Sequence, residues 1–117
     1  MSSEPQHLKQ ARHNEAVTRL LTASRWAADW EVITLFYAAV HLVEAKAAES
    51  NVHSAGHAAR VKFLHACYRA ASMDFEHLLL KSRRVRYECA QMAPADVVEA
   101  RAWLANIGTV LGNYPAV

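Results

Sequence analysis

The sequence contains few of the residues that interrupt helices. Of its 117 residues, three are glycine and three are proline, whereas 23 are alanine. The intervals 6–55 and 57–93 contain neither glycine nor proline. Runs of alternating β-branched residues are missing too, which argues against a sheet. Because alanine-rich segments without such breakers favour helices, the sequence predicts an all-α protein.

Other scarce features disfavour whole classes of protein. The net charge of +2 with neutral histidine is too small for the entire surface to bind nucleic acid nonspecifically. No apolar run approaches the roughly 20 residues that span a bilayer, and the polar N-terminal stretch lacks a signal-peptide pattern. Cys67 and Cys89 lack CxxC spacing. We therefore expect no membrane association, two buried free thiols and a cytoplasmic location.

The length and the apolar content predict one globular helical domain that spans residues 1–117, since 53% of the residues are hydrophobic. The first helix is expected to start at Ser2 or Ser3, before Glu4 and Pro5, and to end near Ser24. The other predicted helices run from about Asp29 to Ser50, from Ser54 to about Ala70, from Phe75 to Ala90, and from Pro94 or Asp96 to Gly112. A turn is expected at Ser72–Asp74. Connections this short favour a four- to five-helix antiparallel up-and-down bundle with the second helix as its spine.

Polar residues occur at three places where a bundle helix is expected to be apolar. Tyr37, His41 and Glu44 stand at i, i+4 and i+7, so they share one face of the second predicted helix. The stretch HSAGHAAR contributes His53, His57 and Arg60. The stretch KSRRVRYE contributes Lys81, Arg83, Arg84, Arg86, Tyr87 and Glu88. Each place also has a structural explanation, either as a hydrogen-bond ladder between helices or as a solvated basic face.

Taken together, the three places predict a binding groove if the second, third and fourth predicted helices pack consecutively. Arginines match the geometry of phosphate, and tyrosines offer a face to a base. With Ser54 as the N-cap, His57 would lie at the third helical position, near the positive end of the helix dipole, and would be neutral near pH 7. The predicted RNA- or nucleotide-binding residues are Tyr37, His41, Glu44, His57, Arg60, Arg83, Arg84 and Tyr87.

The histidine pair at HxxxH spacing raises the question of a metal ion. His53 and His57 could reach one ion together, but zinc sites need at least three protein ligands and the sequence offers no obvious third one nearby. We therefore predict neither a metal site nor another cofactor.

Four ordered blocks of the chain resemble the HEPN domains of prokaryotes. These blocks are FYAAVHLVEA, HSAGHAAR, LLLKSRRVRYE and DVVEARAWLANI, within roughly Glu15 to Ile107. HEPN domains are small helical bundles that commonly dimerise, so the resemblance implies a homodimer. Many act in toxin–antitoxin, CRISPR-related or other defence systems, and some pair with minimal nucleotidyltransferases. The resemblance therefore also implies a partner protein encoded nearby.

Active HEPN members are metal-independent RNases with an arginine, usually followed by a polar residue, and a histidine four to six residues later. Arg60 and His65, in RVKFLH, fit this spacing. However, Val61 follows Arg60, and the late SRRVRYE stretch, where the family motif normally lies, has no histidine. Five residues turn an α-helix by about 500°, which leaves the two side chains roughly 140° apart. We therefore interpret RVKFLH as a coincidental match.

Three functions from different classes follow from these observations. The main hypothesis is a non-catalytic HEPN-like module that binds RNA, a nucleotide or a partner protein through the predicted groove. The alternative is a metal-independent RNase toxin in which His57, or less favourably His65, is the base and an arginine such as Arg60 stabilises the transition state. A third hypothesis is a purely structural dimerisation bundle, with an interface drawn from Trp26, Trp30 and Trp103.

Overall fold

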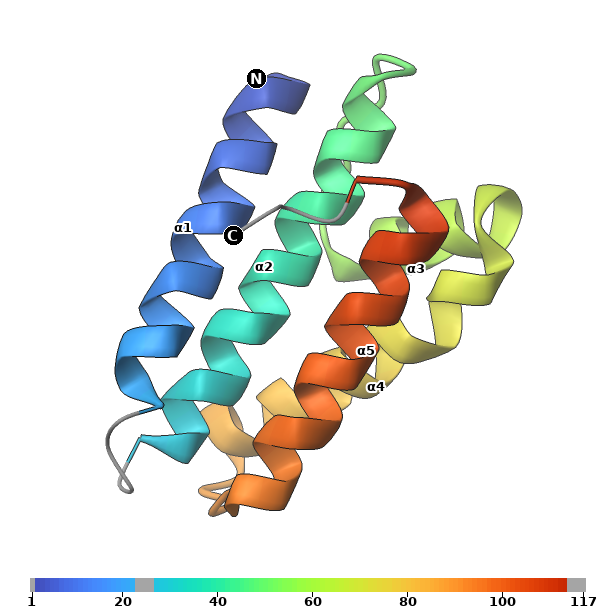
Figure 1. Ribbon diagram of the computed structural model, residues 1–117. Coiled ribbons are helices and arrows are strands. Elements are labelled where there is room, and N and C mark those ends of the chain that lie inside the picture. Colours follow the sequence, from blue (N-terminus) through green and yellow to red (C-terminus); the bar gives the residue numbers. More distant parts are fainter. Residues whose placement is uncertain (1, 23–26, 114–117) are drawn as a thin grey trace.

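The computed structural model describes residues 2–22 and 27–113, and these ranges contain helices but no strand. The helices are α1 (Glu4–Leu21), α2 (Ala28–Ala48), α3 (His57–Cys67), α4 (Arg69–Tyr87) and α5 (Pro94–Leu111). In Figure 1, α1 and α2 run antiparallel, as do α4 and α5. The predicted all-α bundle is confirmed. No helix in the described ranges combines the length and the apolar character that crossing a membrane requires.

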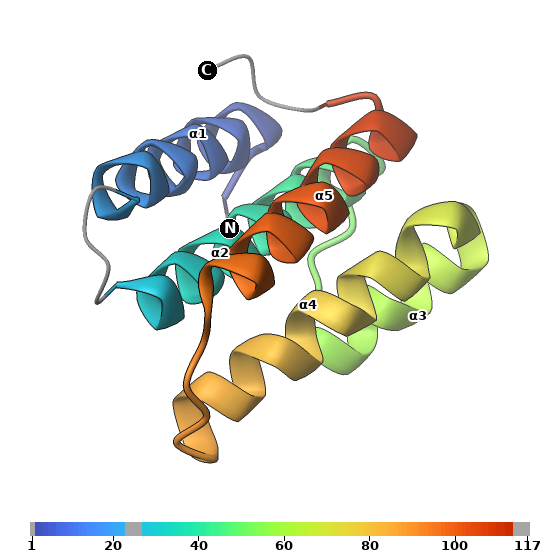
Figure 2. The same cartoon turned by 60° about the horizontal axis from the view of Figure 1, so that its bottom comes forward.

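Helix α2 is the centre of the bundle, as the sequence predicted. It contacts each of the other four helices, with α1 on one side and the α3–α4 pair on the other (Figure 2). Its buried residues lie on most sides of the helix and do not form a single stripe, as in Phe36, Ala38, Val40 and Leu42. A helix that is apolar on nearly all sides must be covered on all sides. Polar side chains in the middle of α2, such as Tyr37 and Glu44, therefore face neighbouring helices.

The ends of α1 and α5 follow the expected local chemistry. Ser3 caps α1: its hydroxyl accepts from the Gln6 backbone N–H, and the Gln6 side chain accepts from the Ser3 backbone N–H. Helix α5 begins at Pro94 and is closed by Gly112, whose φ of 71° lies in the left-handed region that favours glycine. The predicted end of the first helix near Ser24 lies outside the described residues.

Two predicted boundaries around α3 are wrong. Helix α3 begins at His57 with Gly56 at the N-cap position. Ser54 lies before the helix, where its backbone N–H donates to Glu44 Oε2 at 3.4 Å. No turn occurs at Ser72–Asp74. The chain breaks at Tyr68, whose ψ of 60° leaves the helical region, and α4 continues through residues 72–74. Ser72 is buried there, so packing of this segment overrides the turn preference of its residue types.

The expectation of two buried thiols is also wrong, because both cysteines are exposed. Cys67 is the last residue of α3. Cys89 follows α4 with a φ of 53°, where the chain leaves the helix toward α5. Both cysteines therefore lie at helix ends, outside the packed interior that usually holds a free thiol.

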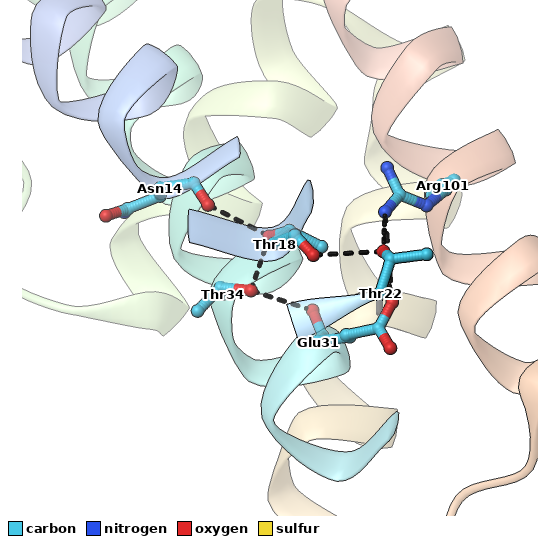
Figure 3. A network of polar contacts seen from close by, with 6 residues as sticks. All are labelled: Asn14, Thr18, Thr22, Glu31, Thr34 and Arg101. Atoms are coloured by element: carbon cyan, nitrogen blue, oxygen red, sulfur yellow. Dashed lines mark hydrogen bonds and ion pairs between the residues drawn. The ribbon is translucent and has the colours of Figure 1, made fainter. Parts of the chain in front are cut away.

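A polar network joins α1, α2 and α5 at one end of the bundle (Figure 3). The hydroxyl of Thr22 lies 3.0 Å from Glu31 Oε2 and accepts from Arg101 Nη2 at 2.9 Å. Arg101 also lies 3.8 Å from the buried Glu31 carboxylate. Thr18 and Thr34 connect α1 to α2 through their hydroxyls. Because buried polar groups need partners, this network fixes how the three helices align.

Candidate functional site

The predicted polar face of α2 connects this helix to three others. Tyr37 bonds to a residue of α4, His41 to a residue of α1, and Glu44 to a residue of α3. These contacts agree with the structural explanation for this face, a hydrogen-bond ladder between helices. Because Tyr37, His41 and Glu44 are used in these contacts, the side chains that can reach a ligand come mainly from α3 and α4.

Glu44, Arg60 and His57 form a bonded chain between α2 and α3. Arg60 Nε donates to Glu44 Oε1 at 2.6 Å, and Arg60 Nη1 lies 2.8 Å from His57 Nδ1. Because a guanidinium only donates, His57 Nδ1 must accept, and the proton of the neutral ring must sit on Nε2. His57 therefore presents an N–H donor at its Nε2 atom.

The pKa of His57 is lowered from its ordinary value, as expected, but for a different reason. Burial is the main cause, followed by the positive charges of Arg60, Arg86 and Arg83. His57 stands at the first helical position of α3, not at the third position predicted with Ser54 as the cap. These arginines also show that α4 contributes positive charge to the surroundings of His57.

Arg86 is enclosed by aromatic rings and anchored by hydrogen bonds. Its Nη1 donates to the Tyr37 hydroxyl at 3.0 Å, while Nε and Nη2 donate to the carbonyl and hydroxyl of Ser82. Its Cζ lies 5.4 Å from the ring centroid of Phe36, 5.7 Å from that of Tyr37 and 5.1 Å from that of Tyr87. Our predicted site residues omitted Arg86, although its place four residues after Ser82 is a signal for side-chain contact on a helix.

Phe36 joins these two groups of contacts beneath the surface. Its fully buried ring lies 5.1 Å, centroid to centroid, from the His57 ring, which it meets edge-on. Contacts therefore run without a gap from Tyr87 through Arg86 and Phe36 to His57. We define the basic–aromatic face as His57, Arg60, Arg86 and Tyr87, together with Arg83, whose positive charge acts on His57.

Arg84 does not share this face, contrary to the predicted groove. It lines a separate hollow of about 460 Å³ between α4 and α5, together with Lys81 and Trp103. Its charge acts on the α5 residue Asp96. Arg83 and Arg84 are neighbours in sequence, but adjacent helical residues point about 100° apart. Arg83 and not Arg84 is among the charges that act on His57, so we assign Arg83 alone of the two to the basic–aromatic face.

His65 is bonded to α4 and not to Arg60. Its Nε2 atom lies 3.1 Å from the hydroxyl of Ser72 and 3.5 Å from Glu76 Oε2. A serine, a histidine and an acid thus meet, but both partners approach the same ring nitrogen and Ser72 is buried. A nucleophilic triad requires the hydroxyl and the acid on opposite ring nitrogens. Arg60 and His65 make contacts with different helices, in agreement with the roughly 140° that separates them around the helix axis.

A histidine pair joins α1 to α2 beside the Glu44–Arg60 ion pair. The Nδ1 atoms of His7 and His41 lie 2.8 Å apart, so one ring donates and the other accepts. Burial is the first cause that lowers the pKa of each histidine; the positive charge of Arg60 lowers both further and Glu44 opposes the shift. His53 also lowers the pKa of His7. Residues 2–22 and 27–113 contain no group of three His, Cys, Asp or Glu side chains that could hold a metal ion.

We expect the stability of the protein to decrease on acidification because of these histidines. The pKa values of His7, His41 and His57 are lowered from 6.5 in the fold. Their contribution to stability is therefore complete above pH 6.5 and is lost as the pH falls through the lowered values. Urea unfolding between pH 8 and pH 5 should show this decrease. The decrease should be smaller in His41→Gln than in the wild type. It should match the wild type in the control His13→Gln, which alters an exposed residue of α1. An equal pH response in all three proteins would contradict the prediction.

The tryptophans proposed for a dimer interface occupy different environments. Trp30 is exposed near the start of α2. Trp103 packs on His77, with 5.1 Å between ring centroids, and lines the hollow between α4 and α5. Trp26 lies outside the described residues. Trp30 and Trp103 thus come from separate helices, and the predicted interface stays a prediction.

Comparisons with known proteins add no information about this site. No family model, curated protein or solved structure matches the chain. The resemblance to HEPN domains therefore stays a prediction based on the sequence blocks, and functional inference has to come from the geometry of the basic–aromatic face.

Proposed function

We propose that this protein is a HEPN-like helical module that binds RNA through the basic–aromatic face without cleaving it. The observation that carries this proposal is the arrangement of cations around exposed ring surface. Arg60 bonds to His57, the positive charges of Arg83 and Arg86 act on the same histidine, and Tyr87 is exposed. Arginine is the side chain that best matches phosphate oxygens, and an exposed aromatic ring adds affinity for bases.

The donors needed for phosphate are available on this face. Within the described ranges, Arg60 uses its Nε and Nη1 atoms for Glu44 and His57, which leaves its Nη2 group for a ligand. His57 adds the N–H at Nε2. Arg83 is exposed, so its entire guanidinium can reach a phosphate. These donors favour an anionic ligand over a neutral one.

The hydrogen bond from Arg60 supports binding over cleavage. A general base needs a free lone pair, but the lone pair on His57 Nδ1 accepts from Arg60 and its Nε2 carries a proton. His65 shares its Nε2 between Ser72 and Glu76. To act as the base of the alternative RNase, His57 would have to lose the bond to Arg60.

Replacing Arg83 by alanine is expected to weaken RNA binding about tenfold, the effect of losing one charge-assisted phosphate contact of about 1.4 kcal/mol. The matched control is Arg84→Ala, which removes the same charge from the next residue but faces the hollow between α4 and α5. Its affinity should stay within about twofold of wild type. The measurement is fluorescence anisotropy with a labelled single-stranded RNA at several salt concentrations, where Arg83→Ala should also reduce the salt slope by about one.

Two results of this experiment would contradict the proposal. Equal losses in both variants would mean that net charge governs binding and not the basic–aromatic face. No binding by the wild type would turn the search to a partner protein.

A second measurement tests for cleavage. The RNA is examined on a denaturing gel after incubation with the protein without metal, and it should be intact. Cleavage that disappears in His57→Ala would replace the binding module with the metal-independent RNase.

A further inference from the structure

Tyr87 exposes more aromatic surface than a monomeric helical bundle requires. It is the last residue of α4, and 73% of its surface is accessible. The guanidinium of Arg86 packs against the ring, with its Cζ 5.1 Å from the ring centroid. The ring is thus supported by a cation on one side and remains open to solvent elsewhere.

The support under Tyr87 is itself held in place. Arg86 donates three hydrogen bonds, to the Tyr37 hydroxyl and to the carbonyl and hydroxyl of Ser82. It also packs against the buried ring of Phe36. Arg86 therefore offers the Tyr87 ring a fixed cation to pack on. A ring that is already supported in this way loses less conformational entropy when a planar ligand stacks on its open side.

Arg83 lies one helical turn before Tyr87. Residues at i and i+4 are neighbours on a helix surface, with about 5–6 Å between their Cβ atoms. A cation for phosphate and an aromatic face for a base are thus side by side on the exposed part of α4. This spacing is suited to one nucleotide whose base is free to leave its own stack.

We propose that Tyr87 is a stacking platform for an unpaired base, and that the protein therefore selects single-stranded over double-stranded RNA. This inference rests on the proposed function and specifies its substrate class. A duplex keeps its bases paired and stacked, so it offers phosphates to Arg83 but no base face to Tyr87. Stacking on an aromatic side chain contributes about 1–3 kcal/mol per base, which corresponds to roughly 5- to 150-fold in affinity.

The test compares one labelled RNA strand, alone and annealed to its complement, in binding to the wild type, Tyr87→Phe, Tyr87→Leu and Arg83→Ala. The wild type should bind the single strand at least about fivefold more tightly than the duplex. Tyr87→Phe should keep this preference, because it keeps the ring. Tyr87→Leu keeps an apolar side chain but lacks a π-face, so it should weaken single-strand binding at least about fivefold and leave duplex binding unchanged. Because Tyr87 is exposed, neither substitution should unfold the protein.

The results separate this inference from the proposed function. Equal affinity of the wild type for single strand and duplex, or an unchanged affinity in Tyr87→Leu, would overturn the stacking platform. If Arg83→Ala still weakened binding in that case, the RNA-binding face would stand without base stacking. A wild type that binds neither RNA would overturn the proposed function together with the inference.

Discussion

Replacing Phe36 by alanine is expected to lower the free energy of unfolding by about 3–5 kcal/mol. The side chain is fully buried in α2, at the point where this central helix meets α3 and α4. Its ring centroid lies 5.9 Å from that of Phe75 and 5.1 Å from that of His57, and Arg86 packs against it. Alanine would remove the packing surface shared by these side chains and leave a cavity that rigid helices cannot fill.

Urea denaturation followed by circular dichroism measures this loss. Phe36→Leu should cost less, about 1–2 kcal/mol, because it keeps most of the buried apolar volume. Leu20→Ala is a matched control for removing an apolar side chain on the surface, since Leu20 is 79% exposed, and should change stability by no more than about 0.5 kcal/mol. A loss below about 1 kcal/mol in Phe36→Ala would contradict the packing of α2 against α4 described above.

Replacing Arg60 by methionine while Glu44 remains is expected to cost about 3 kcal/mol. The Glu44 side chain is only 7% exposed and that of Arg60 16%, and their ion pair closes at 2.6 Å. Without the guanidinium, the Glu44 carboxylate would remain desolvated and uncompensated, and breaking a buried pair in this way costs about 3–5 kcal/mol. His57 Nδ1 would lose its donor as well. The low end of the range applies because Arg60 is partly exposed.

The double variant Arg60→Met with Glu44→Leu should be more stable than Arg60→Met alone. Replacing both charges by apolar groups removes the uncompensated carboxylate, so the second substitution restores stability. The restoration should be incomplete, because the backbone N–H of Ser54 also donates to Glu44 Oε2. Urea unfolding of the wild type, both single variants and the double variant gives the coupling energy. Additive losses would show that the two side chains do not act as a pair.

The helical content of this protein could be predicted from the sequence because it depends on local chemistry. Long intervals without glycine or proline favour helices wherever they occur. The cap at Ser3 and the stop at Gly112 also act through neighbouring backbone atoms. The segment around Ser72 could not be predicted in this way. Its residue types favour a turn, but contacts with distant residues keep it helical.

The candidate site was likewise predictable in part from local sequence spacing. The spacing of Tyr37, His41 and Glu44 placed them on one face of a helix. It did not reveal that His7, 34 residues away, is the partner of His41. The position of Arg86 among three rings also required the packing of α4 against α2.

The sequence by itself determined that the chain forms helices, where α1 begins, where α2 and α5 begin and end, and which polar residues share a helix face. These properties depend on backbone preferences and on the period of one helix. The tertiary structure alone decided that the charge of Arg83 acts on His57 while Arg84 faces α5, and that Arg60 holds His57 as a neutral donor. Such outcomes depend on the rotation and the crossing of whole helices, because a small rotation changes which neighbouring side chain meets a given partner.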